Sequence, residues 1–341
     1  MSLGADMPFV CLAVAGKCNL TCRYCTHTAD GCAPADEDMT IGLARRVLNA
    51  LDVYGVREVR LSGREPLLHS GVQSIIDHSL QLQFDQVRIN TNGSLPIQPL
   101  LRYADDRFVV IVKLDTMDPA IDSWLHGRAV ADTALTDIEC CVEHGLRTRV
   151  NTVLSASTHR SLPSLTLSLL DYPVRHKLLQ LEYYPDIQEF YDQEAVRMCE
   201  VAFPFPERIV QSYSYRAEMG FGMDSAVYVS GYTISKRSGQ FGSARYAGFC
   251  RDCDLYPCQE GLYHIYCSQF GTFRPCKKGG PEFVPADTYS EEALLLSLDG
   301  AVRAAHTDSH FGNGANCLSL PRSPHAGRGI QEGDMQNKLK P

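Results

Sequence analysis

The chain has 341 residues, 44% of them hydrophobic, and a formal net charge of −8. This length fits one large barrel-like domain or two ordinary domains, and the acidic balance argues against a nucleic-acid binder that works by phosphate neutralisation. We find no signal peptide and no run of about 18 apolar residues that could span a membrane, so we expect a cytoplasmic protein with no membrane partner.

Short apolar runs alternate with helical patterns along the first half of the chain. The predicted strands are 9–15, 58–61, 87–91, 109–114, 149–154 and 178–183. The predicted helices are 41–54, 71–81, 97–104, 133–145 and 160–171. This alternation predicts a parallel α/β sheet, either a partial (β/α)6 TIM-like barrel or an ordinary doubly wound sheet. In both architectures ligands bind beyond the carboxyl ends of the strands.

The predicted domains are a barrel over 8–185 and three segments that follow it. Residues 186–245 are rich in Tyr, Phe, Pro and Gly and are predicted to form an irregular connecting or substrate region. Residues 246–304 contain a cysteine cluster and a predicted helix over 290–304. Residues 319–341 are polar and are predicted to form a flexible tail.

Three of the 14 cysteines lie on one short predicted loop after the first strand. Cys18, Cys22 and Cys25 have the spacing C-x3-C-x2-C and no fourth cysteine beside them. A structural zinc site needs four ligands, and His27 or Cys32 would have to supply the fourth. Three thiolates instead suggest a [4Fe–4S] cluster with one open iron.

This cysteine run closely resembles the signature of the radical S-adenosylmethionine (radical SAM) superfamily. The resemblance implies that SAM binds the open iron and that reductive cleavage produces a 5′-deoxyadenosyl radical, which abstracts hydrogen from a substrate. It also implies an external reductant such as flavodoxin or ferredoxin.

The stretch Ser62-Gly63-Arg64-Glu65-Pro66 follows the second predicted strand. It resembles the family's Gly-Gly-Glu-Pro stretch, whose backbone holds the SAM amino group. Arg64 replaces the second glycine, which a backbone contact tolerates where φ is negative. A plain strand-to-helix turn is the alternative interpretation.

Polar side chains also lie at the ends of the next two predicted strands and on the one after them. In the family, such residues bind the ribose and carboxylate of SAM, and the candidates here are Thr91, Asn92, Lys113 and Asn151. The resemblance places Tyr24 beside the adenine. Each residue taken singly also fits an ordinary turn or strand edge.

A second group of cysteines lies within residues 250–276. It resembles the auxiliary-cluster region of the molybdenum-cofactor GTP cyclase branch and the short twitch version of the SPASM domain. The resemblance implies a second [4Fe–4S] cluster, with candidate ligands Cys250, Cys253, Cys258 and Cys276. Cys267 is either a further ligand or a core residue, and a zinc ribbon is the alternative.

The match to the cyclase branch covers 8–185 and 246–280 but departs from it where that branch recognises GTP. Lys17 replaces an arginine, and residues 259–263 replace an arginine-rich stretch. We therefore favour a small-molecule enzyme, for example a nucleoside or sugar-acid decarboxylase (a lyase) in antibiotic biosynthesis, similar in size and class to cytosylglucuronate decarboxylase. The alternatives are a maturase of ribosomal peptides, a GTP cyclase and a non-catalytic iron–sulfur redox protein. For the maturase, we expect too few residues before the first strand to form a leader-binding domain.

Four residues are candidates for substrate chemistry. Arg149 or Lys113 is expected to pair with a substrate carboxylate. Glu182 or Asp115 is a candidate general acid/base or hydroxyl clamp, with Glu182 and Tyr184 predicted on one face of the sixth strand. Surface ion pairs are the alternative for each of them.

Overall fold

The computed structural model describes residues 9–26, 36–169, 171–196, 243–254, 262 and 264–313. Its main sheet has eight strands in the order β6-β5-β4-β3-β2-β1-β8-β9. Strands that follow one another from β1 to β6 are parallel neighbours: β1 (Phe9–Ala15), β2 (Glu58–Gly63), β3 (Gln86–Thr91), β4 (Phe108–Lys113), β5 (Arg147–Leu154) and β6 (Arg175–Gln180). The prediction of an open, parallel α/β barrel is confirmed.

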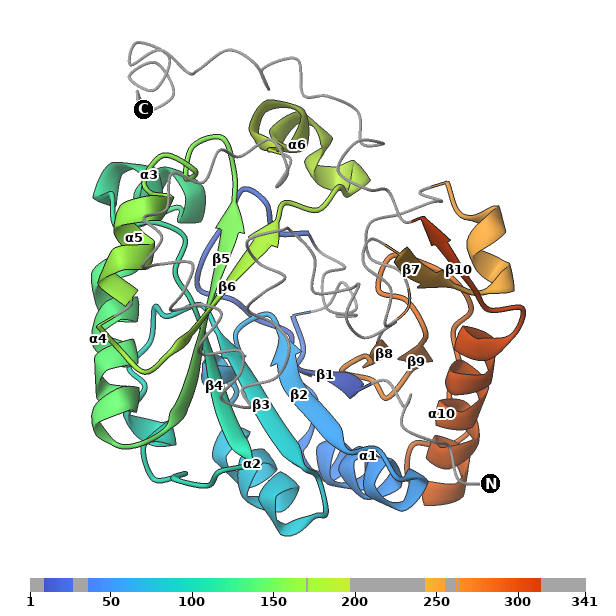
Figure 1. Ribbon diagram of the computed structural model, residues 1–341. Helices are drawn as coiled ribbons and strands as arrows, with labels where there is room; N and C mark the ends of the chain where they lie inside the picture. Colours follow the sequence, from blue (N-terminus) through green and yellow to red (C-terminus); the bar gives the residue numbers. More distant parts are fainter. Residues whose placement is uncertain are drawn as a thin grey trace.

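Helices cover the outer face of this sheet (Figure 1): α1 (Ile41–Tyr54), α2 (Val72–Gln81), α4 (Ala131–Glu143) and α5 (Leu162–Leu169). α1 begins where the Thr40 side chain accepts a hydrogen bond from the Leu43 N–H, and it ends at Gly55 in the left-handed conformation. All seven residues of β1 are buried, because this strand lies between β2 and β8 in the sheet. A continuous apolar run is typical of such a parallel strand.

The cysteine-rich region extends the same sheet. β8 (His264–Cys267) pairs in parallel with β1, and β9 (Phe273–Arg274) pairs antiparallel with β8. α10 (Glu291–His306) packs on α1, while β7 (Ser243–Tyr246) and β10 (His310–Asn313) form a separate two-stranded sheet. Figure 1 shows these elements grouped beside β1 and α1.

The bounds of two predicted elements need particular correction, and the helices over 119–126 and 188–194 were missed. β6 ends at Gln180, three residues before the predicted end, because its register with β5 pairs Leu154 with Gln180. The predicted helix over 97–104 is only the short 3-10 turn η3 (Gln98–Leu100). The longer missed helix is α3 (Pro119–His126), although Asp118 as the N-cap, Pro119 and the left-handed Gly127 are recognisable start and stop signals.

Several predictions concern residues outside the described ranges. They include Cys258, the tail over 319–341 and most of the region 186–245, of which 186–196 and 243–245 are described. Among the described helices, none combines the length and apolar character needed to cross a membrane.

Packing of α10 on α1 should depend on the inward face of α10. Leu298 is fully buried, whereas Leu296 is 67% exposed. We expect Leu298→Ala to lower the free energy of unfolding by about 2–5 kcal/mol, because the truncated side chain leaves a cavity. Leu296→Ala is the matched control and should change it by less than about 0.5 kcal/mol. Urea titration followed by circular dichroism measures both, and equal effects would contradict this packing.

Candidate active site

The cysteine loop is held by backbone hydrogen bonds to the carboxyl end of α3. The Thr21 and Arg23 N–H groups donate to the carbonyls of His126 (3.2 Å) and Leu125 (2.9 Å), and Arg23 Nε donates to the Trp124 carbonyl (2.8 Å). The last carbonyls of a helix have no partner within the helix. The missed helix α3 therefore supplies the acceptors that fix the loop.

Each cysteine sulfur of this loop receives one N–H donor from a different strand end. Two of the three donors are cationic side chains, which stabilise thiolates. The contacts join Asn92 Nδ2 to Cys18 Sγ (3.6 Å), Lys113 Nζ to Cys22 Sγ (3.3 Å) and Arg64 Nη1 to Cys25 Sγ (3.8 Å). The three sulfurs thus lie at the carboxyl ends of β2, β3 and β4, where the parallel-sheet architecture predicts a ligand site.

Burial and charge act in opposite directions on these thiols. The pKa of Cys22 is raised by burial, although the Lys113 ammonium acts to lower it. The pKa of Cys25 is raised by burial and by Cys22, although the Arg64 guanidinium acts to lower it. Burial would lower the pKa of Lys113, but Cys22 and Asp115 outweigh it, and the pKa is raised. Lys113 is therefore charged beside Cys22, where it can offset the negative charge of a thiolate.

The three sulfurs do not form a site for one metal ion. Within the described ranges, no three His, Cys, Asp or Glu side chains are grouped as the ligands of a single ion would be. A [4Fe–4S] cluster is held by Cys thiolates on separate irons, so its ligands need not converge on one point. The three thiols and their N–H donors fit such a cluster.

The stretch after β2 is clamped against the cysteine loop. The Arg64 and Glu65 N–H groups donate to the carbonyls of Ala15 and Lys17, both at 2.9 Å. Gly63 has a φ of 106°, and a Cβ there would lie 2.4 Å from the Ala15 carbonyl oxygen. Arg64 is not among the positive-φ residues of the described chain, so its side chain is tolerated as predicted.

The Glu65 carboxylate is fully buried beneath this stretch. One oxygen accepts from the Asn92 N–H (2.7 Å) and the other from the Leu67 N–H (3.0 Å). Burial raises the pKa of Glu65 to about 7, against the lowering effect of these hydrogen bonds. Glu65 therefore joins the ends of β2 and β3, and its side chain is committed to the backbone.

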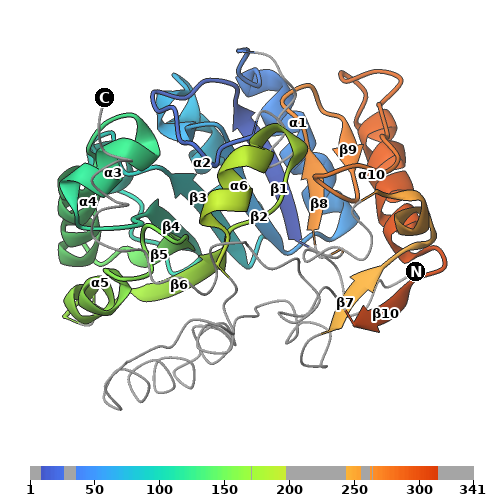
Figure 2. The same ribbon diagram turned by 90° about the horizontal axis from the view of Figure 1, so that it is seen from above.

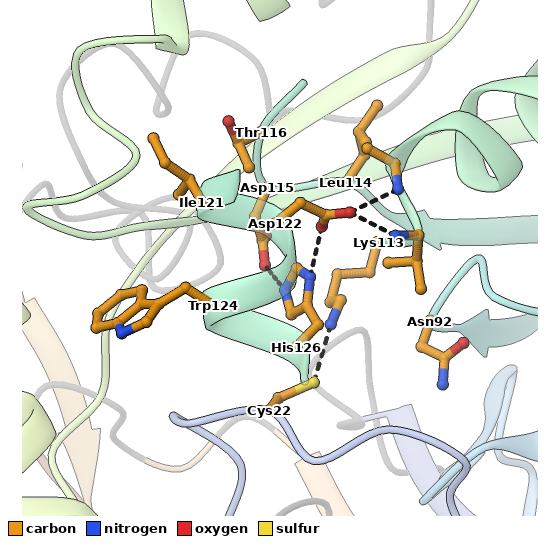
Figure 3. A network of polar contacts seen from close by, with 12 residues as sticks. Cys22, Asn92, Lys113, Leu114, Asp115, Thr116, Ile121, Asp122, Trp124 and His126 are labelled. Atoms are coloured by element: carbon orange, nitrogen blue, oxygen red, sulfur yellow. Dashed lines mark hydrogen bonds and ion pairs between the residues drawn. The ribbon is translucent and has the colours of Figure 1, made fainter. Parts of the chain in front are cut away.

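Asp115 belongs to a buried polar network, and Figure 3 shows its contact with His126. Its carboxylate accepts hydrogen bonds from the Tyr24 hydroxyl and from the Val153 N–H (2.7 Å), and it contacts His126 Nε2 (2.9 Å). Burial would raise the pKa of Asp115, but His126, Lys113 and Tyr24 outweigh it and hold the pKa low. Asp115 thus joins the cysteine loop, β5 and α3.

His126 continues the network toward α4. Its Nδ1 lies 2.7 Å from Asp122 Oδ1, and the other Asp122 oxygen accepts from the N–H groups of Val130 and Ala131. Burial and Lys113 act to lower the pKa of His126, but the two carboxylates outweigh them and raise it. Both ring nitrogens face carboxylates (Figure 3), the arrangement that suits a protonated imidazole.

The remaining predicted site residues are spread along their strands. Arg149 is buried near the start of β5, where its Nε donates to Asn151 Oδ1 (3.0 Å). Thr91 is buried, and its hydroxyl accepts from the Gly93 N–H (3.3 Å). Glu182 follows β6 rather than lying on it, which corrects its predicted position on a strand face.

Sequence reasoning missed Asp122 and His126 as members of the site. Their i, i+4 spacing places them on one side of a helix, and this signal is present in the sequence. Finding them depended on predicting α3.

A short helix above the strand ends completes the mouth of the site. α6 (Gln188–Glu194) lies over the carboxyl ends of the parallel strands (Figures 1 and 2). The Phe190 ring lies 6.3 Å from the Tyr24 ring and 5.8 Å from the Trp124 ring, measured between centroids. α6 therefore covers the cysteine loop on the side of Tyr24.

Three of the four predicted auxiliary ligands are described. Cys250 lies on the 3-10 turn η6 (Gly248–Asp252), Cys253 follows it, and Cys276 follows β9. A Cβ on Gly280 would lie 2.7 Å from the Phe249 ring, so the segments carrying Cys276 and Cys250 pack together. Cys267 is fully buried in the core, and burial raises the pKa of its thiol.

Residues 12–156 match the radical SAM superfamily. These residues of the chain therefore form a radical SAM domain. Members use a [4Fe–4S] cluster and SAM, which are therefore its cofactors.

The sequence relatives are named as GTP 3′,8-cyclases. A probable GTP 3′,8-cyclase of Methanopyrus kandleri is 26% identical over 96% of this chain and 99% of its own length. One of Methanothermobacter marburgensis is 30% identical over 40% of this chain and 44% of its own length. A GTP 3′,8-cyclase of Clostridium perfringens is 26% identical over 44% and 48%. The last two matches thus span less than half of the relatives they align with.

Solved structures share the fold. The Streptococcus suis protein SuiB bound to S-adenosylmethionine superposes with a TM-score of 0.56 at 15% identity, covering 80% of this chain and 60% of SuiB. The protein anSMEcpe with bound AdoMet superposes with a TM-score of 0.54 at 13% identity, covering 85% and 81%.

The buried Glu65 should make stability depend on pH. Its pKa rises from 4.5 to about 7 in the folded protein, so the folded state binds the proton more tightly than the unfolded state. The free energy of unfolding should therefore fall as pH rises between these values, by at most about 1.4 kcal/mol per pH unit. Glu65→Gln should remove this slope, whereas the exposed control Glu143→Gln should keep it. Urea titrations of the metal-free protein across this range test it, and parallel profiles for Glu65→Gln and wild type would refute it.

Arg64 should raise the reduction potential of the proposed cluster. A cation and N–H donor beside a ligand sulfur stabilises the additional electron of the reduced cluster. We expect Arg64→Gln to lower the midpoint potential of the SAM-free, cluster-loaded protein in an electron paramagnetic resonance redox titration. Arg64→Lys, which keeps the charge, should lie closer to wild type. An unchanged potential in Arg64→Gln would exclude this role.

Proposed function

We propose that this radical SAM enzyme acts on a small molecule and that Cys18, Cys22 and Cys25 are the ligands of its SAM-binding cluster. The observation that carries the assignment is that each of the three sulfurs has its own N–H donor from a separate strand end. An iron–sulfur protein without catalysis would need the cysteines but not these surroundings.

When bound, the cluster and SAM supply a radical that abstracts hydrogen from the substrate. In this proposal, the backbone of Gly63 and Arg64, before Pro66, binds the SAM amino group, since Ala15 and Lys17 hold this stretch at the loop. Asn92, Lys113, Thr91 and Asn151 are the proposed contacts to the rest of SAM. Asp115 and His126 are positioning residues that orient Tyr24 rather than a general acid or base, because their polar atoms are engaged in the buried network.

The second group of cysteines is proposed to hold an auxiliary [4Fe–4S] cluster. Cys250, Cys253, Cys276 and Cys258 are the proposed ligands. The packing of Gly280 against Phe249 supports this, because it brings the first and last cysteines of the set into neighbouring segments. Cys267 belongs to the core in this proposal, since it is fully buried on β8.

For the reaction, we favour a nucleoside or sugar-acid substrate, with decarboxylation as the specific hypothesis. A flavodoxin or ferredoxin would supply the electron. The strands leave the sheet open between β6 and β9, and α6 lies over the strand ends. These features support a small substrate held beside the cofactor.

GTP cyclisation is the second candidate. The Methanopyrus kandleri relative named as a probable GTP 3′,8-cyclase aligns over nearly the whole of both chains, which favours it. Lys17 and residues 259–263 differ from the cyclase pattern and favour a different substrate. Parallel incubations with GTP and with cytosylglucuronate, analysed by mass spectrometry, separate the candidates: a cyclised GTP product supports the second, and loss of carbon dioxide supports the first.

Removing one ligand from each proposed cluster should have different effects on SAM cleavage. In reconstituted protein with SAM and dithionite, Cys22→Ala should abolish formation of 5′-deoxyadenosine, because the cluster loses a ligand at the SAM-binding site. Cys276→Ala should retain part of it. The control Cys140→Ala, on the outer helix α4, should match wild type.

Two further measurements decide the assignment. Wild-type protein that forms no 5′-deoxyadenosine would refute the radical function. Iron close to about four atoms per chain, rather than about eight, would refute the auxiliary cluster alone.

A further inference from the structure

Two consecutive lysines after Cys276 meet a carboxylate that follows β6. Lys277 Nζ lies 2.8 Å from Glu182 Oε2, and Lys278 Nζ lies 3.6 Å from the same oxygen. Lys278 Nζ also donates to the Tyr183 carbonyl (3.2 Å), and the Tyr184 hydroxyl donates to Glu182 Oε2 (3.2 Å). These four side chains, Glu182, Tyr184, Lys277 and Lys278, are called the lysine site below.

The lysine site bridges the opening of the sheet. β6 and β9 stand at opposite ends of the strand order, so no backbone pairing joins them in the described sheet. Glu182 follows β6, and the two lysines follow β9. Side chains rather than strand pairing therefore connect the two edges, and their partners can be exchanged without disturbing the sheet.

The Lys278 ammonium is unusually buried for a lysine. Its side chain is only 5% exposed, and that of Lys277 is 12% exposed. An ammonium has three donors. For Lys278 the described residues provide the Tyr183 carbonyl within hydrogen-bond distance, while Glu182 lies slightly beyond it. The ammonium also lies over the Tyr184 ring, 4.6 Å from its centroid, and the negative face of the ring favours the cation. A desolvated ammonium with these contacts would bind an incoming anion strongly.

The site is connected to both cysteine groups. The Lys278 N–H donates to Cys276 Sγ (3.4 Å), which places the lysines beside a proposed auxiliary ligand. On the other side, the Tyr183 ring packs on the Tyr191 ring of α6 (5.3 Å), and Phe190 of the same helix contacts Tyr24. A ligand bound by the lysines would therefore lie between the auxiliary region and the helix that covers the cysteine loop.

We infer that Lys277 and Lys278 bind an oxyanion of the substrate, a carboxylate or a phosphate, and that Glu182 occupies their ammonium groups until the substrate arrives. This inference rests on the proposed function, because the lysines bind a substrate only if the protein is an enzyme that acts on a small molecule. It also assigns Glu182 a role different from the general acid or base expected from the sequence: Glu182 is the internal competitor of the substrate anion.

Calorimetric titration of the cluster-loaded protein with three related sugars tests this inference. D-glucuronate carries a carboxylate, D-glucose 6-phosphate carries a phosphate, and D-glucose is neutral. We expect at least one anionic sugar to bind about tenfold or more tightly than glucose, a difference that two ammonium contacts readily provide. The preferred anion identifies which oxyanion the site takes.

Variants of the site should shift this affinity in opposite directions. Lys278→Gln and Lys277→Gln should each weaken binding of the preferred anion, whereas Glu182→Gln should strengthen it by removing the competing carboxylate. Lys278→Arg should keep most of the affinity and guards against a folding defect in Lys278→Gln. The double variant Arg57→Gln/Arg102→Gln is the matched control, because it removes two exposed cations that pair with Asp85 and Asp77 elsewhere.

The outcomes separate this inference from the proposed function. Anion binding that is equal to glucose binding, or that Glu182→Gln weakens, would overturn the lysine site even in a protein that cleaves SAM. Anion binding with the expected variant pattern in a protein that forms no 5′-deoxyadenosine would support the lysine site and refute the radical function.

Discussion

The active site depends on holding three thiols on one short loop at the mouth of an open sheet. The loop has little apolar surface of its own, since Leu20 is its buried aliphatic residue. Its position is therefore determined by hydrogen bonds: to the carbonyls at the end of α3 and, through Tyr24, to Asp115. Asp115 is a charged group without solvent contact, and such a group is tolerated only where donors surround it. The Tyr24 hydroxyl, the Val153 N–H and His126 are those donors, and they come from three separate parts of the barrel.

Each cysteine sulfur likewise has a donor from a distant part of the chain. Lys113 and Arg64 place cations at two sulfurs, and Asn92 places a neutral donor at the third. Arg64 occupies a position where the related motif has glycine, so the guanidinium at Cys25 is a property of this chain. The backbone of the same residue still donates to Ala15, and the substitution thus adds a side-chain contact without removing the backbone clamp.

The sheet brings the two ends of the described chain together. β8 pairs with β1 and β9 pairs with β8, so the strands that precede Cys276 and the cysteine loop belong to one sheet. The sheet is not closed by strands, and ion pairs between Glu182 and the two lysines connect its edges instead. In the inference drawn above, a substrate anion replaces Glu182 at these lysines, and this exchange would leave the backbone hydrogen bonds of the sheet intact. The fold thereby relates the cysteine loop, the auxiliary region and the lysine site.

Local patterns in the sequence were sufficient for the cysteine loop, the alternation of strands with helices and the motif after β2, because each depends on residue spacing over a short segment. The bounds of β6 depend on its register with β5, and Glu182 was misplaced for that reason. The partners of Arg64, Asp115 and Glu182 come from residues far away in the chain, so no local pattern contains them. The sequence by itself thus determined the chemistry that the three cysteines can support. Only the tertiary structure decided which donors face each sulfur and which cations meet Glu182, because those contacts exist only once distant strand ends share one edge of the sheet.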